Sequence, residues 1–126
     1  MDLETMLSSI TIRRRPGTYT VATVPGPVSA GDGVEAVIVE DEGTTVIATW
    51  EEAERRGWSV GFVAAWLTVE VHSALEAVGL TAAMSAVLAD HGISCNVLAG
   101  YFHDHLLVPV ERADEAIAAL QSLRER

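Results

Sequence analysis

The first half of the chain alternates hydrophobic and polar residues over short stretches that are separated by turn-forming residues. Alternation with a period of two is typical of strands that bury one face, and Asp41-Glu42-Gly43 indicates a hairpin turn. Thr49 precedes an acidic segment and is expected to cap a short helix. The strands expected in this half cover residues 10–14, 19–24, 34–40 and 44–49, and the helices cover residues 2–8 and 51–56.

The second half has longer and more regular patterns. The apolar run over residues 60–71 predicts a strand that is buried on both faces. Leu80, Met84, Val87 and Leu88 then recur at the spacing of a helix that ends near Gly92. The remaining elements expected here are strands over residues 93–99 and 104–110 and a helix over residues 112–123.

The order of elements in the second half is strand, helix, strand, strand and helix, which is one strand short of a ferredoxin-like unit. We expect the strand over residues 19–24 to supply the missing place. The N-terminal half (residues 1–57) and the C-terminal half (residues 58–126) would then interlock as one body. The predicted fold class is therefore α+β.

The charge and the cysteine content of the chain limit the partners and the location that it can have. The chain has 126 residues and a formal net charge of −10, and all eight of its basic residues are arginine. An acidic surface without a basic stripe argues against nucleic acid and anionic membranes as partners. A single cysteine and an N-terminus without the basic segment of a secretory leader indicate a reducing, cytoplasmic location. The apolar run over residues 60–71 is too short for a transmembrane helix.

The segment over residues 71–80 leads from a buried strand into a helix and is the first candidate for a binding site. The first N–H groups of a helix have no intrahelical partner and carry the positive end of its dipole, so they attract a carboxylate. Glu76 and Asp104 are acids that suit an ammonium group. Asn96 can donate and accept hydrogen bonds, and Gly79 lets a ligand approach the backbone closely. This combination matches the two charged groups of an α-amino acid.

Other interpretations of the polar residues stay open. Ser73 and the acid three residues after it form a capping box, which needs no ligand. His103 and His105 project from one face of a strand and, with His72 or Cys95, are the beginning of a metal site. The alternative for the two histidines is a polar hairpin end, and the alternative for Cys95 is a small buried hydrophobe.

Three stretches carry a resemblance to a known family. They read HSALEAVGLT from His72 to Thr81, GISCNV from Gly92 to Val97, and HDHLLVP from His103 to Pro109. This pattern resembles the small bacterial proteins with a CASTOR-type ACT domain, and its spacing is similar to that of the regulatory ACT domains of aspartate kinases. The first half of the chain matches the same family more loosely.

The resemblance implies a ferredoxin-like two-layer sandwich of two interlocked ACT-like halves that binds a small molecule, usually an amino acid, without catalysis. In such domains the ligand lies by the first strand-to-helix loop and the start of the second strand, often between two units. Together with the acid at position 104, the expected ligand-binding residues are His72, Glu76, Val78, Gly79, Leu80, Asn96 and Asp104.

Three functions of different classes follow. The first is an amino-acid-binding regulatory protein that forms a homodimer and needs no cofactor or metal. The second is a small metal-dependent enzyme built around His72, His103 and His105. The third is a structural interaction domain without a ligand.

Overall fold

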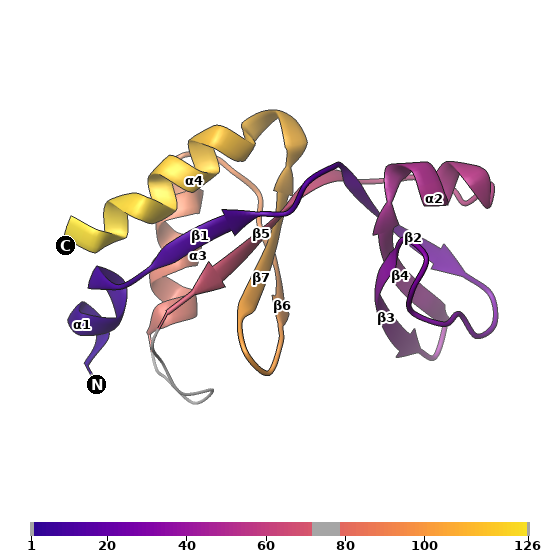
Figure 1. Ribbon diagram of the computed structural model, residues 1–126, viewed down its shortest axis with the longest axis horizontal. Helices are drawn as coiled ribbons and strands as arrows, with labels where there is room; N and C mark the ends of the chain where they lie inside the picture. The colour runs from indigo at the N-terminus through magenta and orange to yellow at the C-terminus, as the bar shows by residue number, and fades with distance from the viewer. Residues whose placement is uncertain (1, 72–78, 126) are drawn as a thin grey trace. The chain divides into compact units, whose positions relative to one another are not determined.

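A computed structural model describes residues 2–71 and 79–125 of the chain. Within these residues, the apolar run in the middle of the chain forms the longest strand, β5 (Val63–Glu70). The chain divides into two compact units. The larger comprises residues 1–15 and 65–126, and the smaller comprises residues 16–64. Strand β5 begins in the smaller unit and runs most of its length in the larger one (Figure 1).

The larger unit is a four-stranded arrangement with helices packed against it. Its strands are β1 (Thr11–Arg14), β5, β6 (Asn96–Ala99) and β7 (Asp104–Pro109), and its helices are α1 (Leu3–Ser8), α3 (Leu80–Asp90) and α4 (Ala113–Gln121), with 3-10 turns at Val110–Arg112 and Ser122–Glu125. Strand β5 lies between β1 and β7, and β6 is at the edge beyond β7. No helix in residues 2–71 and 79–125 is long and apolar enough to cross a membrane.

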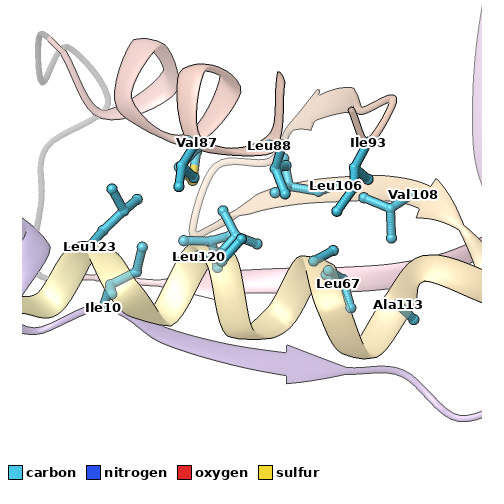
Figure 2. Packing of buried hydrophobic residues seen from close by; sticks show 14 of the residues in the cluster. Ile10, Leu67, Val87, Leu88, Ile93, Leu106, Val108, Ala113, Leu120 and Leu123 are labelled. Atoms are coloured by element: carbon cyan, nitrogen blue, oxygen red, sulfur yellow. The ribbon is translucent and has the colours of Figure 1, made fainter. Parts of the chain in front are cut away.

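The core of the larger unit lies between this sheet and helices α3 and α4. Figure 2 shows Val87 and Leu88 of α3 and Leu120 of α4 pointing toward one another. Alternate residues of β5 enter the same cluster, because successive side chains of a strand point to opposite faces. The cluster also contains Ile10, Ala65, Leu67, Val69, Met84, Ile93, Leu106, Val108, Ala116 and Leu123. Two helices on one face of a sheet ordered β1-β5-β7-β6 form a ferredoxin-like unit, which confirms the predicted α+β class.

The strand that completes this unit is not the one we expected. Strand β1 lies antiparallel to the second half of β5, with Ile12 opposite Val69, and Ile12 packs against the core. Strand β2 (Tyr19–Val24) pairs with β5 only at Val63 and Ala64. The turn after Pro16, where Gly17 adopts a φ of 92°, separates β1 from β2. The two short strands therefore pair with different parts of β5.

The smaller unit is an antiparallel sheet with one helix. It contains β2, β3 (Val34–Glu40), β4 (Gly43–Thr49) and α2 (Trp50–Arg55). Strand β4 lies between β2 and β3, and Ala22, Val34, Val46 and Ala48 form its small core. Thr49 caps α2 as predicted, because its hydroxyl oxygen accepts from the N–H of Glu52 at 3.2 Å.

Helices α3 and α4 are joined by an arginine. The guanidinium group of Arg112 donates to the carbonyl oxygens of His91 at 2.8 Å and Gly92 at 3.3 Å. Carbonyl groups at the C-terminus of a helix lack intrahelical partners and carry the negative end of its dipole, so a cation suits this position. Arg112 therefore fixes the C-terminal end of α3 to the start of α4.

Candidate functional site

Helix α3 begins at Leu80, and Gly79 is its N-cap. Gly79 has a φ of 96°, a left-handed conformation that glycine adopts without steric cost, and it caps the helix without a side-chain hydrogen bond. The predicted capping box depends on Ser73 and Glu76, which lie outside the described residues. The first turn of α3 contains no acidic residue. Gly79 itself therefore supplies no side-chain acceptor to the first N–H groups of α3.

The geometry around Gly79 is tight on one side. A Cβ atom on Gly79 would lie 3.1 Å from Cδ2 of Leu3, a residue of α1. Residues without a Cβ allow the backbone of a neighbouring group to approach closely. Gly79 therefore allows Leu3 of α1 to pack closely, and it also forms the N-cap of α3.

The structure describes only part of the predicted ligand site. His72, Glu76 and Val78 lie outside the described residues. The side chain of Leu80 is 5% exposed and belongs to the core, so only its backbone is available at the start of α3. Leu80 thus contributes to packing rather than offering its side chain to a ligand.

Asn96 and Asp104 lie at opposite ends of the β6–β7 ladder. Asn96 is exposed and pairs with Leu107, whereas the half-buried Asp104 pairs with Ala99. The two ends of β6 are about 10 Å apart at the usual rise per residue. The structure therefore does not bring these two predicted residues together.

A polar cluster occupies the face of the sheet that points away from the helices. Trp66, Thr68 and Glu70 alternate with the residues of β5 that enter the core, and His103 and His105 meet them from β7 and the turn before it. The two histidines therefore share one face, as predicted from their spacing. Trp66 was not among the predicted site residues, although alternation along β5 places it on the same face as Thr68 and Glu70.

His105 accepts a hydrogen bond from the tryptophan of this cluster. Its Nδ1 atom lies 3.1 Å from Nε1 of Trp66 and 3.0 Å from Oγ1 of Thr68. The indole and imidazole rings meet edge to face, with centroids 5.4 Å apart. Burial is the main cause that lowers the pKa of His105 from its ordinary value of 6.5, so the ring is neutral at pH 7.

The second histidine belongs to an ion-pair group at the end of β5. One carboxylate oxygen of Glu70 lies 3.7 Å from Nε2 of His103 and 3.7 Å from a guanidinium nitrogen of Arg13. The Nδ1 atom of His103 is buried and has no hydrogen-bond partner among the described residues. Arg15, just after β1, stacks its guanidinium group over the ring of Trp66 at 4.1 Å.

This cluster does not assemble a metal site within the described part of the chain. No group of three histidine, cysteine, aspartate or glutamate side chains in residues 2–71 and 79–125 is placed to hold an ion. The Nδ1 atom of His105 is already occupied by Trp66, and His72 lies outside the described residues. Cys95 packs against the core, and burial raises the pKa of its thiol, as expected for a small hydrophobe.

Comparisons with known proteins agree on one family. A model of the ACT domain matches residues 62–122, and a second ACT domain model matches residues 1–65. The two matches meet at the start of β5. No curated protein matches the sequence.

Solved structures resemble the chain over nearly its full length. A protein of unknown function from Vibrio cholerae, described as a possible transport protein, is 40% identical with a TM-score of 0.87, covering 97% of this chain and 95% of its own. A protein from Agrobacterium tumefaciens is 17% identical with a TM-score of 0.69, covering 92% and 90%. The ligand-free regulatory subunit of aspartate kinase from Thermus thermophilus is 10% identical with a TM-score of 0.65, covering 94% and 97%.

Proposed function

Because the chain belongs to the ACT domain family, we propose that it is a regulatory protein that binds a small ligand, an amino acid, and does not itself catalyse a reaction. The observation that carries this proposal is the backbone conformation at the N-terminus of α3. Gly79 begins the helix in a left-handed conformation and without a side-chain cap, so the first N–H groups of the helix can donate to the carboxylate of a ligand.

The ligand's ammonium group would meet acidic side chains near the same place. Glu70 and Asp104 lie at neighbouring strand ends, because His103, which precedes Asp104, contacts the carboxylate of Glu70. Within the proposal, Glu76 and Asp104 hold the ammonium group, and His72 and Val78 line the side-chain end of the ligand. A carboxylate and a helix N-terminus together match the opposite charges of an α-amino acid.

Asn96 has a different place in the proposal. It lies at the other end of the β6–β7 ladder and follows the C-terminus of α3. Since α3 has 11 residues, about 16 Å of helix separates the two ends. Asn96 therefore contacts a ligand held by a second copy of the chain, in line with a homodimer that binds between subunits. Sedimentation equilibrium tests the dimer, because a monomeric mass at micromolar concentration contradicts it.

The ligand is tested by a thermal-shift screen of the purified protein against the twenty amino acids. A ligand present at 100 times its Kd adds about 2.7 kcal/mol to the free energy of unfolding. We expect a concentration-dependent rise in Tm with one or a few amino acids. The rise should disappear in Glu76→Gln and remain in Glu42→Gln, a matched change at an exposed glutamate of the smaller unit. No rise with any amino acid contradicts the proposal.

The location proposed with this function is the cytoplasm. The chain has one cysteine, Cys95, which is a free thiol in the structure. Free thiols persist in reducing compartments. Fractionation of cells that express the protein with a small C-terminal tag tests this, and recovery outside the cytoplasmic fraction contradicts it.

A further inference from the structure

His105 has two different hydrogen-bonding groups at a single ring nitrogen. The Nε1 atom of Trp66 lies 3.1 Å from Nδ1, and Oγ1 of Thr68 lies 3.0 Å from the same atom. A neutral imidazole nitrogen without a hydrogen has one lone pair, whereas a protonated one offers a single N–H. The two neighbours therefore compete for Nδ1.

The chemistry of the neighbours fixes the proton of the neutral ring. An indole N–H is only a donor, so Nδ1 must act as an acceptor toward Trp66. The proton of neutral His105 then resides on Nε2. The hydroxyl of Thr68 differs from the indole because it both donates and accepts.

A second proton reverses this arrangement. Once Nδ1 carries a hydrogen, it opposes the N–H of Trp66, and that hydrogen bond is lost. The same hydrogen finds an acceptor in Oγ1 of Thr68, which already lies within hydrogen-bond distance. Nδ1 thus has one partner in each protonation state, Trp66 when it is neutral and Thr68 when it is protonated, and protonation removes the acceptor of the buried indole N–H.

The charged groups around the ring set the pH at which it changes. Burial is the largest cause that lowers the pKa of His105, followed by Arg15 and His103, while Asp104 opposes them. Arg15 comes from the segment after β1 and is stacked on Trp66. On β5, Glu70 faces His103 and Arg13 of β1, so its negative charge is shared by that pair.

The imidazole ring is also in contact with the hairpin between β6 and β7. A Cβ atom on Gly100 would lie 3.0 Å from Nε2 of His105, so the hairpin backbone passes close to the ring. The N–H of Gly100 donates to the carbonyl oxygen of His103 at 3.0 Å and closes the turn. Tyr101 and Phe102 follow in this turn and are 76% and 82% exposed. A reorientation of the ring would therefore reach an exposed aromatic pair.

We propose that His105 is a proton-operated switch whose Nδ1 accepts from Trp66 when neutral and donates to Thr68 when protonated, and that this exchange loosens the hairpin at Gly100. The switch needs no ligand, although its strand also carries Asp104, which the proposed function places at the ammonium group of the amino acid. A fall in pH would change how the hairpin presents Tyr101 and Phe102.

NMR of the full-length protein, labelled with ¹⁵N, tests the proposal. At about pH 8 the ring of His105 should carry its proton on Nε2. As the pH falls, the indole resonance of Trp66 should shift with the same midpoint as His105, below the ordinary value of 6.5. Amide exchange at Gly100, corrected for its intrinsic pH dependence, should lose protection over the same range. A neutral ring that carries its proton on Nδ1 would overturn the proposal.

Two substitutions should move the pKa of His105 in opposite directions. Trp66→Phe removes the donor to neutral Nδ1 and should raise it by roughly half a unit to one unit. Thr68→Val keeps the shape but removes the acceptor for the protonated ring, so it should lower the pKa. Thr81→Val, an exposed threonine of α3, is the matched control and should leave it unchanged.

The signs of the two pKa shifts of His105 decide whether it acts as a switch. A purely structural role of the triad predicts shifts of the same sign or none, and either outcome overturns the switch. If Trp66→Phe does not fold, the tautomer of the wild-type ring and the shift in Thr68→Val still decide it.

Discussion

Gly79 offers a direct test of the entry into α3, through the substitution Gly79→Ala. Two costs arise from the structure. The first is conformational, because the φ of 96° is disfavoured for any residue with a Cβ by about 1–2 kcal/mol. The second is steric, because the new Cβ would lie 3.1 Å from Cδ2 of Leu3. The end of a leucine side chain can move by a few tenths of an ångström, so we expect the conformational cost to dominate.

The expected result is a loss of about 1–2 kcal/mol in the free energy of unfolding, or roughly 3–8 °C in Tm for a domain of this size. Urea unfolding followed by circular dichroism measures it. Gly92→Ala is the matched control, because Gly92 has a φ of 67° and no atom within 4 Å of the added Cβ. The difference between the two variants isolates the contact with Leu3.

A third variant separates strain from contact. Asparagine tolerates the left-handed conformation better than alanine but is larger. Gly79→Asn should therefore unfold at a lower urea concentration than wild type but at a higher one than Gly79→Ala if backbone strain dominates. The reasoning fails if Gly79→Ala has wild-type stability, or if Gly79→Asn is the less stable of the two.

Three further predictions concern packing, helix ends and pH. Leu106→Ala, at a side chain that is 0% exposed, should cost about 2–5 kcal/mol in urea unfolding; a loss below about 1 kcal/mol contradicts the described core. Arg112→Ala removes the donors to His91 and Gly92 and should lower the urea midpoint by less than Leu106→Ala, with partial recovery in Arg112→Lys. Because the pKa of folded His105 is lowered, its contribution to stability is complete above about pH 6.5 and is lost as the pH falls through the folded pKa. Wild type should therefore lose more stability than His105→Gln between about pH 7.5 and pH 5, and equal losses would contradict this.

Local patterns in the sequence predicted most individual elements correctly. The strand expected over residues 19–24 is β2 (Tyr19–Val24), and the strand over residues 34–40 is β3 (Val34–Glu40). The helix that begins at Leu80 was visible from its apolar spacing. These features follow from hydrophobic periodicity, turn residues and caps, which depend on neighbours within one or two turns of the chain.

Strand partners and the polar cluster required the tertiary structure. Nothing local distinguishes β1 from β2 as the neighbour of β5, because pairing depends on the path of the chain through the turn at Pro16. Asn96 and Asp104 are close in sequence, yet the antiparallel ladder separates them.

The sequence by itself determined the class of fold, the family and the glycine that begins α3. The tertiary structure decided which side chains meet. His105 reaches Trp66 across 39 positions of sequence, because β5 and β7 lie side by side in the sheet. Hydrogen bonds between distant strands depend on register and strand order, which arise from the packing of the whole unit.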